Sequence, residues 1–359
     1  MMTKMTSQER MTAVLMGQTP DRVPVNPFVL GYAAQITGIS LGDFYADGDK
    51  CFDAQFAAMR LHGYEQTPMY GYACIGAWEF GGKVGFPYDT AYGAPYILDH
   101  PVKNIEDVER LEVPEFHKGN LPGAYAEADK LNRRCLSLGM PAAIQIGGAF
   151  TAAASIADTT MLLKWMFREP KTVHLLMEKV TEMFLRAIDY FAAEYGPENC
   201  LPFDPTPVEA NTLISGKSFG EFVFPYVLKI HQRIRQVGMQ VVFMHPCADH
   251  NLNIPYYIKL REDANWEGRY IWLFGPETPV ADQIAAFGAT DVTCGNVDPP
   301  SFQFKSYEEM VELCRLNIEE GKNAPGGFIL APGCEFPPIA DPVKIMAMMD
   351  AAEQYGRYE

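Results

Sequence analysis

Three side chains that commonly bind soft metals stand at or just after apolar segments of this sequence. His245 and Cys247 close the run "VVFMHPC", and Cys334 follows "GGFILAPG". One imidazole and two thiolates suit zinc, and a catalytic zinc site keeps a fourth position for substrate or for a carboxylate. Glu277, after the run "YIWLFG", is the candidate carboxylate and a candidate catalytic residue. On spacing alone, buried structural cysteines and a core histidine explain this pattern better than a metal site does.

The elements that must position these residues are short apolar runs bounded by Pro, Gly or Asp, which are typical of strands. The predicted strands are 22–29, 64–71, 141–148, 199–205, 240–246, 270–275, 290–296 and 326–332. Amphipathic stretches of helical spacing alternate with them. The predicted helices include 121–138, 170–195, 219–237, 279–287, 306–321 and 342–355. This alternation indicates parallel strands with right-handed crossovers, and eight such units predict an α/β fold, the TIM (β/α)8 barrel, behind an N-terminal helical extension.

In a TIM barrel the carboxyl ends of all strands meet at one face, where the active sites of barrel enzymes lie. His245, Cys247 and Cys334 would therefore lie close together although they are distant in the sequence. Each follows a predicted strand and precedes a helix start or a Pro-Gly turn, which favours a metal site over the core interpretation. Cys294 also ends a predicted strand, but it directly precedes Gly295 and is interpreted as core.

Further candidates come from other strand ends. Asp204, in "LPFDPTP", is either a turn or helix cap or a catalytic carboxylate that points into the barrel mouth as a hydrogen-bond or proton partner. His250 is either a partner of the metal ligands or, as we favour, a solvated loop histidine. Aromatic side chains near strand ends are mostly core, yet some could form the walls of a flat apolar pocket. The candidate substrate-binding residues are Phe28, Phe203, Trp272 and Phe336.

Composition excludes several classes of function. The chain has 359 residues, 48% of them hydrophobic, and a formal net charge of −16. It has no cluster of Lys and Arg to bind phosphates, and therefore no nucleic acid partner is expected. No apolar run reaches the length of a membrane span, and the N-terminus does not resemble a secretory signal, so we expect a cytoplasmic protein. The eight cysteines form no C-x-x-C pair, which disfavours a disulfide framework.

The sequence contains no linker or low-complexity tract, and residues 1–359 are predicted to form one domain. Between the second and third predicted strands, residues 78–120 contain short pieces broken by Gly and Pro ("WEFGGKVGFPYDTAYGAPYIL"). This pattern predicts a small β insertion over one barrel mouth.

Four blocks of the sequence resemble the uroporphyrinogen decarboxylase superfamily over nearly the whole chain. They are "SQERMTAVLMGQTPDRVPV", "LISGKSFGEFVFPYVLKIHQRI", "TCGNVDPPSF" and "GGFILAPGCEFPP". Within the superfamily, the H-x-C and G-C elements resemble the zinc- and corrinoid-dependent methyltransferases. The resemblance implies a TIM barrel, Zn2+ on His245, Cys247 and Cys334, and a cobalamin or other corrinoid cofactor. The chain has no D-x-H-x-x-G cobalamin motif, so we expect a transient, separate corrinoid protein as partner.

The resemblance leaves the reaction open. Decarboxylases of the superfamily hold a polyanionic porphyrinogen with an arginine-rich motif, whereas the equivalent "RVPVNPFVLGYAAQ" offers only Arg22. The "APGCEFPP" variant, with Glu335 and Phe336, resembles aryl methyl ether O-demethylase components. We therefore expect methyl transfer from a methoxylated aromatic to cob(I)alamin on the partner. The alternative is transfer from a methylcorrinoid to a thiol such as coenzyme M, or to tetrahydrofolate, and decarboxylation is the weakest interpretation.

Overall fold

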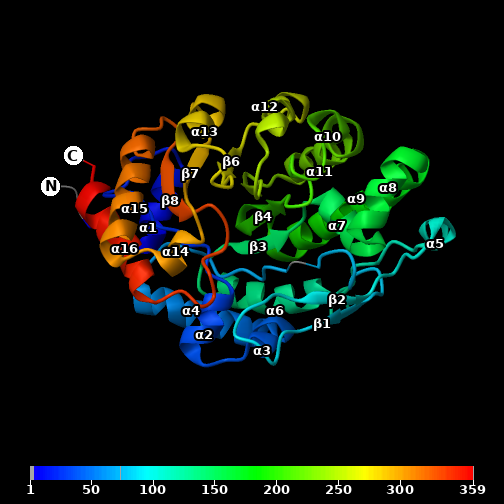
Figure 1. Ribbon diagram of the computed structural model, residues 1–359, viewed down its shortest axis with the longest axis horizontal. Coiled ribbons are helices and arrows are strands. Elements are labelled where there is room, and N and C mark those ends of the chain that lie inside the picture. Colours follow the sequence, from blue (N-terminus) through cyan, green and yellow to red (C-terminus); the bar gives the residue numbers. More distant parts are fainter. Residues whose placement is uncertain (1–3, 73, 359) are drawn as a thin grey trace.

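The centre of the molecule is a parallel sheet of six strands whose order in space follows their order in the sequence (Figure 1). The structure is a computed structural model that describes residues 4–72 and 74–358, so both ends of the predicted domain 1–359 lie outside the described residues. A separate pair of antiparallel strands precedes this sheet in the sequence. The strands are β1 (Lys83–Gly85), β2 (Tyr96–Asp99), β3 (Ala142–Gln145), β4 (Cys200–Pro205), β5 (Val241–His245), β6 (Arg269–Trp272), β7 (Val292–Val297) and β8 (Phe328–Pro332).

Helices surround the parallel sheet (Figure 1). Their bounds are α1 (Ser7–Leu15), α2 (Gly31–Thr37), α3 (Leu41–Ala46), α4 (Gly48–His62), α5 (Ile105–Arg110), α6 (Ala124–Ser137), α7 (Ala149–Ala157), α8 (Thr159–Arg168), α9 (Pro170–Tyr195), η1 (Pro197–Asn199), α10 (Gly216–Phe222), α11 (Phe224–Val237), η2 (Asn251–Asn253), α12 (Ile254–Asp263), α13 (Val280–Phe287), α14 (Ser301–Phe304), α15 (Tyr307–Gly321) and α16 (Val343–Tyr355). Among the described residues, no helix combines the length and apolar character needed to cross a membrane.

The helices complete a circle that the sheet leaves open. Consecutive outer helices from α9 to α16 pack on their neighbours, α16 contacts α4, and α4 contacts α6. The circle closes between α6 and α9, where the Tyr195 hydroxyl donates to Asp129 at 2.6 Å. This arrangement confirms the predicted α/β fold of TIM-barrel type.

The first two predicted strands are not strands in the structure. Residues 22–29 and 64–71 occupy the expected places in the wall, but both are extended segments outside any ladder; the first has isolated bridges at Arg22 and Val25, and the second has none. Asn26 N–H donates to Leu330 O at 2.9 Å, and Leu330 N–H donates to Pro24 O at 2.9 Å, so the first segment lies beside β8. Proline lacks an N–H and cannot continue a ladder, and both segments contain proline.

Glutamine side chains replace the missing ladder. The Gln66 amide donates to Val29 O at 2.9 Å and accepts from Val29 N–H at 2.7 Å, which joins the two extended segments. The Gln55 amide of α4 donates to Met69 O at 2.7 Å and accepts from its N–H at 3.1 Å. Each amide offers a donor and an acceptor, as a neighbouring strand residue would. The wall of the barrel is therefore continued here by side chains.

The predicted helices agree with the structure except in one place. The predicted helix 170–195 is α9 with the same bounds. The predicted helix 219–237 is interrupted at Val223, which separates α10 from α11. Pro225 lies in the first turn of α11, where the lack of an N–H costs no helical hydrogen bond, so it favours the start of a new helix.

The predicted insertion contains the β1–β2 pair, with an irregular register between Lys83 and Val84. The insertion follows the carboxyl end of the second extended segment, and α6 then leads back to the amino end of β3. Its placement over the mouth, and the single domain 1–359, stay predictions.

A buried network of charged side chains fixes α1 to the barrel. Glu65 accepts from Arg10 at 2.5 Å and from Arg22 at 3.0 Å, and its carboxylate also accepts Val25 N–H at 2.7 Å. Arg10 donates to Asp21 as well, at 2.6 Å. The side chains of Glu65 and both arginines are almost inaccessible to solvent. Glu65 therefore compensates two buried cations at once.

We predict that Glu65→Ala destabilises the fold by about 3–5 kcal/mol, because loss of one partner leaves buried charge uncompensated. Urea unfolding measures the change. Asp99→Asn is the control, since its ion pair with Lys103 is exposed and should contribute no measurable stability. Equal midpoints for Glu65→Ala and the parent chain would contradict the prediction.

Candidate metal centre

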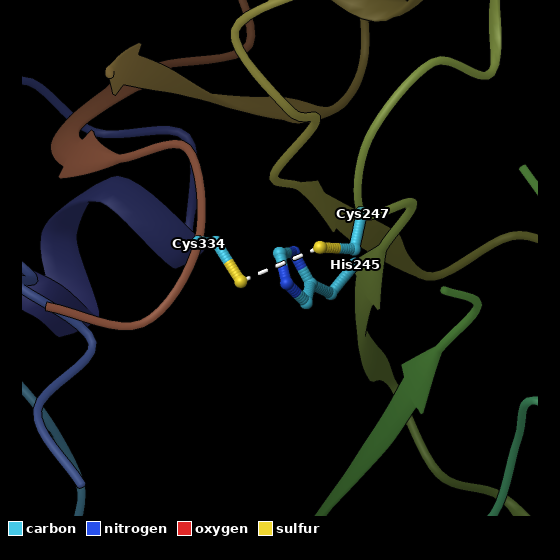
Figure 2. A group of neighbouring side chains, drawn as sticks. All are labelled: His245, Cys247 and Cys334. Carbon is cyan, nitrogen blue, oxygen red and sulfur yellow. Dashed lines mark hydrogen bonds between the residues drawn. The ribbon is translucent and has the colours of Figure 1, made fainter. Parts of the chain in front are cut away.

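Three predicted ligands converge at the carboxyl end of the parallel sheet. The ligand atoms of His245, Cys247 and Cys334 all lie within 4.8 Å of one another. Figure 2 shows Cys334, on the loop after β8, facing His245 and Cys247 at the end of β5. The two sulfur atoms are 3.3 Å apart. Parallel strands bring both loops to the same edge of the sheet, and the donors meet there.

His245 is held in the tautomer that a metal requires. Its Nδ1 lies 2.9 Å from Leu273 O, and a carbonyl oxygen only accepts, so Nδ1 carries the proton. The lone pair is therefore on Nε2. A histidine ligand typically donates its other ring N–H to a carbonyl or carboxylate in this way. The buried ring and the two thiols form a donor set that fits Zn2+.

The loop after β5 is shaped by Ala248 and His250. Ala248 has a φ of 68°, a left-handed conformation that turns the chain just after Cys247. The Nε2 of His250 donates to Cys247 O at 3.1 Å, and its Nδ1 accepts from the Tyr257 hydroxyl at 3.0 Å. Burial lowers the pKa of His250 to about 4, so the ring is neutral. The interpretation of His250 as a solvated loop histidine is wrong, because the ring is fully buried and supports the loop that carries Cys247.

The two thiols differ in acidity because a hydrogen bond joins them. This bond lowers the pKa of Cys247 below its ordinary value. The same bond, together with burial, raises the pKa of Cys334 well above the ordinary value. The pair therefore releases its first proton, from Cys247, more readily than its second, from Cys334. A divalent cation would favour release of that second proton, because the thiolate is the binding form.

The loop that carries Cys334 is tied to its neighbours on both sides. Gly333 N–H donates to Val297 O at 2.9 Å, and a Cβ at position 333 would lie 2.8 Å from a carbon of Pro276. The Glu335 carboxylate accepts Gly31 N–H at 2.9 Å, at the first turn of α2. Burial raises the pKa of Glu335 to about 7. These contacts fix Cys334 opposite His245.

Glu277 lies outside the group of three ligands. It is exposed, and its carboxylate lies over the backbone of Gly275 and Ala248. Its negative charge raises the pKa of Cys247, an effect smaller than that of the Cys334 hydrogen bond, so it lies near the site without joining the cluster. The roles of fourth ligand and catalytic residue for Glu277 stay predictions.

Asp204 points away from the mouth. One carboxylate oxygen accepts Gly148 N–H at 2.6 Å, at the start of α7, and the other lies 3.0 Å from Nε2 of His231 on α11. His231 in turn lies 3.1 Å from the Tyr270 hydroxyl through Nδ1. Asp204 therefore joins the sheet to two helices, and these contacts favour the cap interpretation over a carboxylate in the mouth. Its catalytic role remains a prediction.

The candidate aromatic walls divide into two pairs. Phe28 and Phe203 lie beside the His245 ring, with centroid distances of 5.2 and 6.3 Å. Trp272 instead stacks on Phe287 of α13 at 4.2 Å, in the layer between sheet and helices. Phe336 is fully buried and packs on Tyr32 and Phe302. Only the first pair is placed to contact a substrate at His245.

Phe28 is also one of the few non-glycine residues with positive φ, at 50°. Such a conformation is costly for a bulky residue and is found where surrounding contacts enforce it. Phe336 N–H donates to Phe28 O at 3.2 Å, and the Asn26 side chain accepts Phe28 N–H at 3.0 Å. These bonds hold the Phe28 ring against His245.

Sequence reasoning missed Glu209, a buried carboxylate near the site. It accepts the N–H groups of Phe150 and Thr151 at 3.1 and 3.0 Å, and the Thr151 hydroxyl at 2.6 Å. Burial raises its pKa to about 7. These contacts complete the start of α7. A single Glu in a loop, distant in sequence from its partners, gives no signal that could have identified it.

A cavity lies toward the amino-terminal ends of the strands, away from the three candidate metal ligands. It has a volume of about 810 Å3, and its walls combine inward-facing Phe203, Phe243 and Ile271 with residues that precede β3 and β4. None of the three candidate metal ligands lines it. Phe203 and Phe243 therefore separate this cavity from the site at the carboxyl ends of the strands.

Comparisons with known proteins agree with this fold. The family model "Uroporphyrinogen decarboxylase (URO-D)" matches residues 6–355. The methylcobamide:CoM methyltransferases of Methanosarcina acetivorans and Methanosarcina mazei are each 22% identical, over 99% of both chains. The uroporphyrinogen decarboxylase of an Anaeromyxobacter species is 29% identical over 42% of this chain and 43% of its own length.

Among solved structures, a methyltransferase from Methanosarcina mazei superposes with a TM-score of 0.76 at 18% identity. The alignment covers 98% of this chain and 99% of that chain. At this identity the likeness shows the fold alone, whereas the family match extends over nearly all of the sequence. The chain belongs to the uroporphyrinogen decarboxylase (URO-D) family.

Proposed function

We propose that this protein transfers a methyl group between a corrinoid and a small substrate, with Zn2+ held by His245, Cys247 and Cys334. The observation that carries the proposal is the convergence of one imidazole Nε2 and two sulfurs at the carboxyl end of the sheet. Two relatives that match over 99% of their length are named methylcobamide:CoM methyltransferases, which supports the same class of reaction.

The surroundings of Arg22 disfavour decarboxylation of a polyanionic porphyrinogen. Arg22 donates to Glu353 at 2.9 Å and to Glu65 at 3.0 Å, and its side chain is buried. Both partners carry negative charge, so the guanidinium is already compensated. It is not available as a clamp for substrate carboxylates, which would need several free arginine forks.

The donor set suits activation of a thiol. When bound, Zn2+ would leave one position open for substrate and would keep a coordinated thiol ionised. Two thiolates and a neutral imidazole balance the charge of the ion, so an added substrate thiolate meets no excess negative charge from the ligands. The surrounding residues orient the His245 ring and shield it. Leu273 O fixes the orientation of the ring, and Phe28 and Phe203 exclude water from one side of it.

A thiol is our first choice of methyl acceptor, and an aryl methyl ether is the second candidate. The sequence favoured the ether because of the "APGCEFPP" variant and the bulky residues near the strand ends, but two of these residues, Trp272 and Phe336, pack into the core, away from His245. Phe28 and Phe203 remain beside the imidazole and support a flat aromatic ligand. We propose that a separate protein carries the corrinoid in either case, because methyl transfer requires close, in-line approach to the open mouth.

We predict about one zinc ion per chain after loading, and loss of that ion in Cys247→Ser and Cys334→Ser, because each removes one of three ligands. Elemental analysis after dialysis measures the content. Cys314→Ala is the control, since Cys314 is buried on α15, outside the group. Zinc retained by both serine variants would show that the cysteines are not ligands.

A second prediction separates Glu277 from the ligands. Because its carboxylate is exposed and outside the group, Glu277→Gln should retain zinc, whereas His245→Ala should lose it. Titration with a chromogenic chelator compares the two variants with the parent. If Glu277→Gln releases zinc as readily as His245→Ala, Glu277 is the fourth ligand.

The direction of transfer is tested with free cofactor. We predict that methylcobalamin is demethylated by 2-mercaptoethanesulfonate or another small thiol, and that the Cys247→Ser variant slows this at least a hundredfold. The absorbance change on conversion to cob(I)alamin measures the rate. Tetrahydrofolate is the competing acceptor, and methoxybenzenes, methanol and methylamines are offered with cob(I)alamin to test the reverse sense. If methylcobalamin forms from methoxybenzenes and thiols do not demethylate methylcobalamin, the substrate is an aryl methyl ether and not a thiol.

A further inference from the structure

The insertion exposes a dense group of large apolar side chains. Tyr88, Tyr92, Tyr96 and Leu98 are exposed by 54%, 61%, 51% and 63%. We call these four residues the hairpin patch, since they lie on β2 and on the connection that joins β1 to it. Single exposed apolar residues are ordinary, but tyrosines gathered within a short segment are typical of protein interfaces.

Two of the three tyrosine rings are held in place by glycines. The Tyr88 ring lies where a Cβ of Gly42 in α3 would be, and the Tyr96 ring lies where a Cβ of Gly85 in β1 would be. Each ring therefore rests with one side on backbone while the rest remains exposed. Aromatic rings immobilised before binding lose little conformational entropy when a partner arrives. The hairpin patch is thus preorganised.

A short path of contacts joins the hairpin patch to the metal centre. The Gln35 amide of α2 donates to Ala91 O at 2.8 Å, within the segment that carries the patch. At the other end of α2, Gly31 N–H donates to Glu335, the residue that follows Cys334. The seven residues of α2 span about 10 Å at the usual helical rise. The patch therefore lies roughly one short helix away from the Cys334 loop.

Other exposed apolar residues lie on the loops and short helices that follow the strands. Leu213, Leu252, Phe304 and Ile339 follow β4, β5, β7 and β8 and are exposed by 47%, 62%, 82% and 55%. The loops after β4 and β5 also touch each other, because Leu252 N–H donates to Asn211 at 2.8 Å. Apolar side chains thus occur on several loops around the face where the metal ligands lie.

We propose that the hairpin patch is the docking surface for the protein that carries the corrinoid. This inference rests on the proposed function, in which that protein must bring its cofactor to the mouth. A standard interface covers about 800 Å2 on each partner, which as a disc has a radius of roughly 16 Å. A carrier centred on the mouth therefore reaches the hairpin patch, about 10 Å beyond the Cys334 loop.

The experiment compares protein-bound with free corrinoid. The variant is Tyr92→Ser with Leu98→Ser, the two patch residues whose side chains are most exposed. The control is Met16→Ser with Leu138→Ser, exposed by 72% and 51%, which follow α1 and α6 at the opposite end of the barrel. The probes are free methylcobalamin and a methylated corrinoid protein purified from the organism that makes this chain. Tyr92→Phe keeps the aromatic ring and removes only the hydroxyl, so it tests whether the ring alone is sufficient for binding.

We expect the patch variant to raise KM for the methylated corrinoid protein at least tenfold, because a few aromatic side chains that an interface covers often supply a large share of its binding energy. Its rate with free methylcobalamin should equal that of the parent, and Tyr92→Phe and the control variant should behave as the parent does with both probes. An unchanged KM for the corrinoid protein in the patch variant would overturn the assignment.

Two other outcomes would also overturn it. If sedimentation shows that the parent chain dimerises and the patch variant does not, with KM unchanged, the patch binds a second copy of this chain. If the parent chain transfers methyl from neither probe, the proposed function fails and the docking assignment fails with it. The two failures can be told apart. If the parent chain reacts with free methylcobalamin but the patch variant has an unchanged KM for the corrinoid protein, the proposed function stands and only the docking assignment fails.

Discussion

The parallel alignment of β5 and β8 brings the loops that follow them to one end of the sheet, and the contact between Cys247 and Cys334 depends on it. The two sulfur atoms are 3.3 Å apart, although 87 positions separate the cysteines in the sequence. Each loop is then fixed separately, one by His250 and the other by Gly333 and Glu335. A small shift of either loop would separate donors that a metal must contact together.

In the amino-terminal part of the barrel, side chains supplement a few isolated backbone hydrogen bonds, because prolines prevent a continuous ladder. Gln55 and Gln66 supply paired amide contacts, and Glu65 joins two buried arginines. This arrangement keeps the segment that carries Phe28 beside β8, where its ring contacts His245. The charge network thus supports the site indirectly, through the position of one aromatic wall. It also removes Arg22 from the groups that could bind an anion.

Much of the fold and the convergence of the three candidate ligands could be predicted from periodicity and strand direction. Apolar runs alternate with amphipathic helices, and parallel strands place their carboxyl ends together, so His245, Cys247 and Cys334 had to meet. The direction of a single side chain is harder to predict, because neighbouring strand residues point to opposite sides. Ile271 lines the interior cavity, while the adjacent Trp272 stacks on Phe287 outside the sheet. Asp204 likewise points to α11, one residue after inward-facing Phe203.

The claim on which this account depends is that His245, Cys247 and Cys334 bind zinc and leave one position for a substrate thiol. X-ray absorption at the zinc edge of the loaded protein measures this directly, because sulfur and lighter ligands scatter differently. The account predicts two sulfurs at about 2.3 Å with nitrogen or oxygen completing the shell, and a third sulfur after addition of a thiol substrate. A shell without sulfur, or one whose sulfur count does not change when the thiol is added, would contradict it.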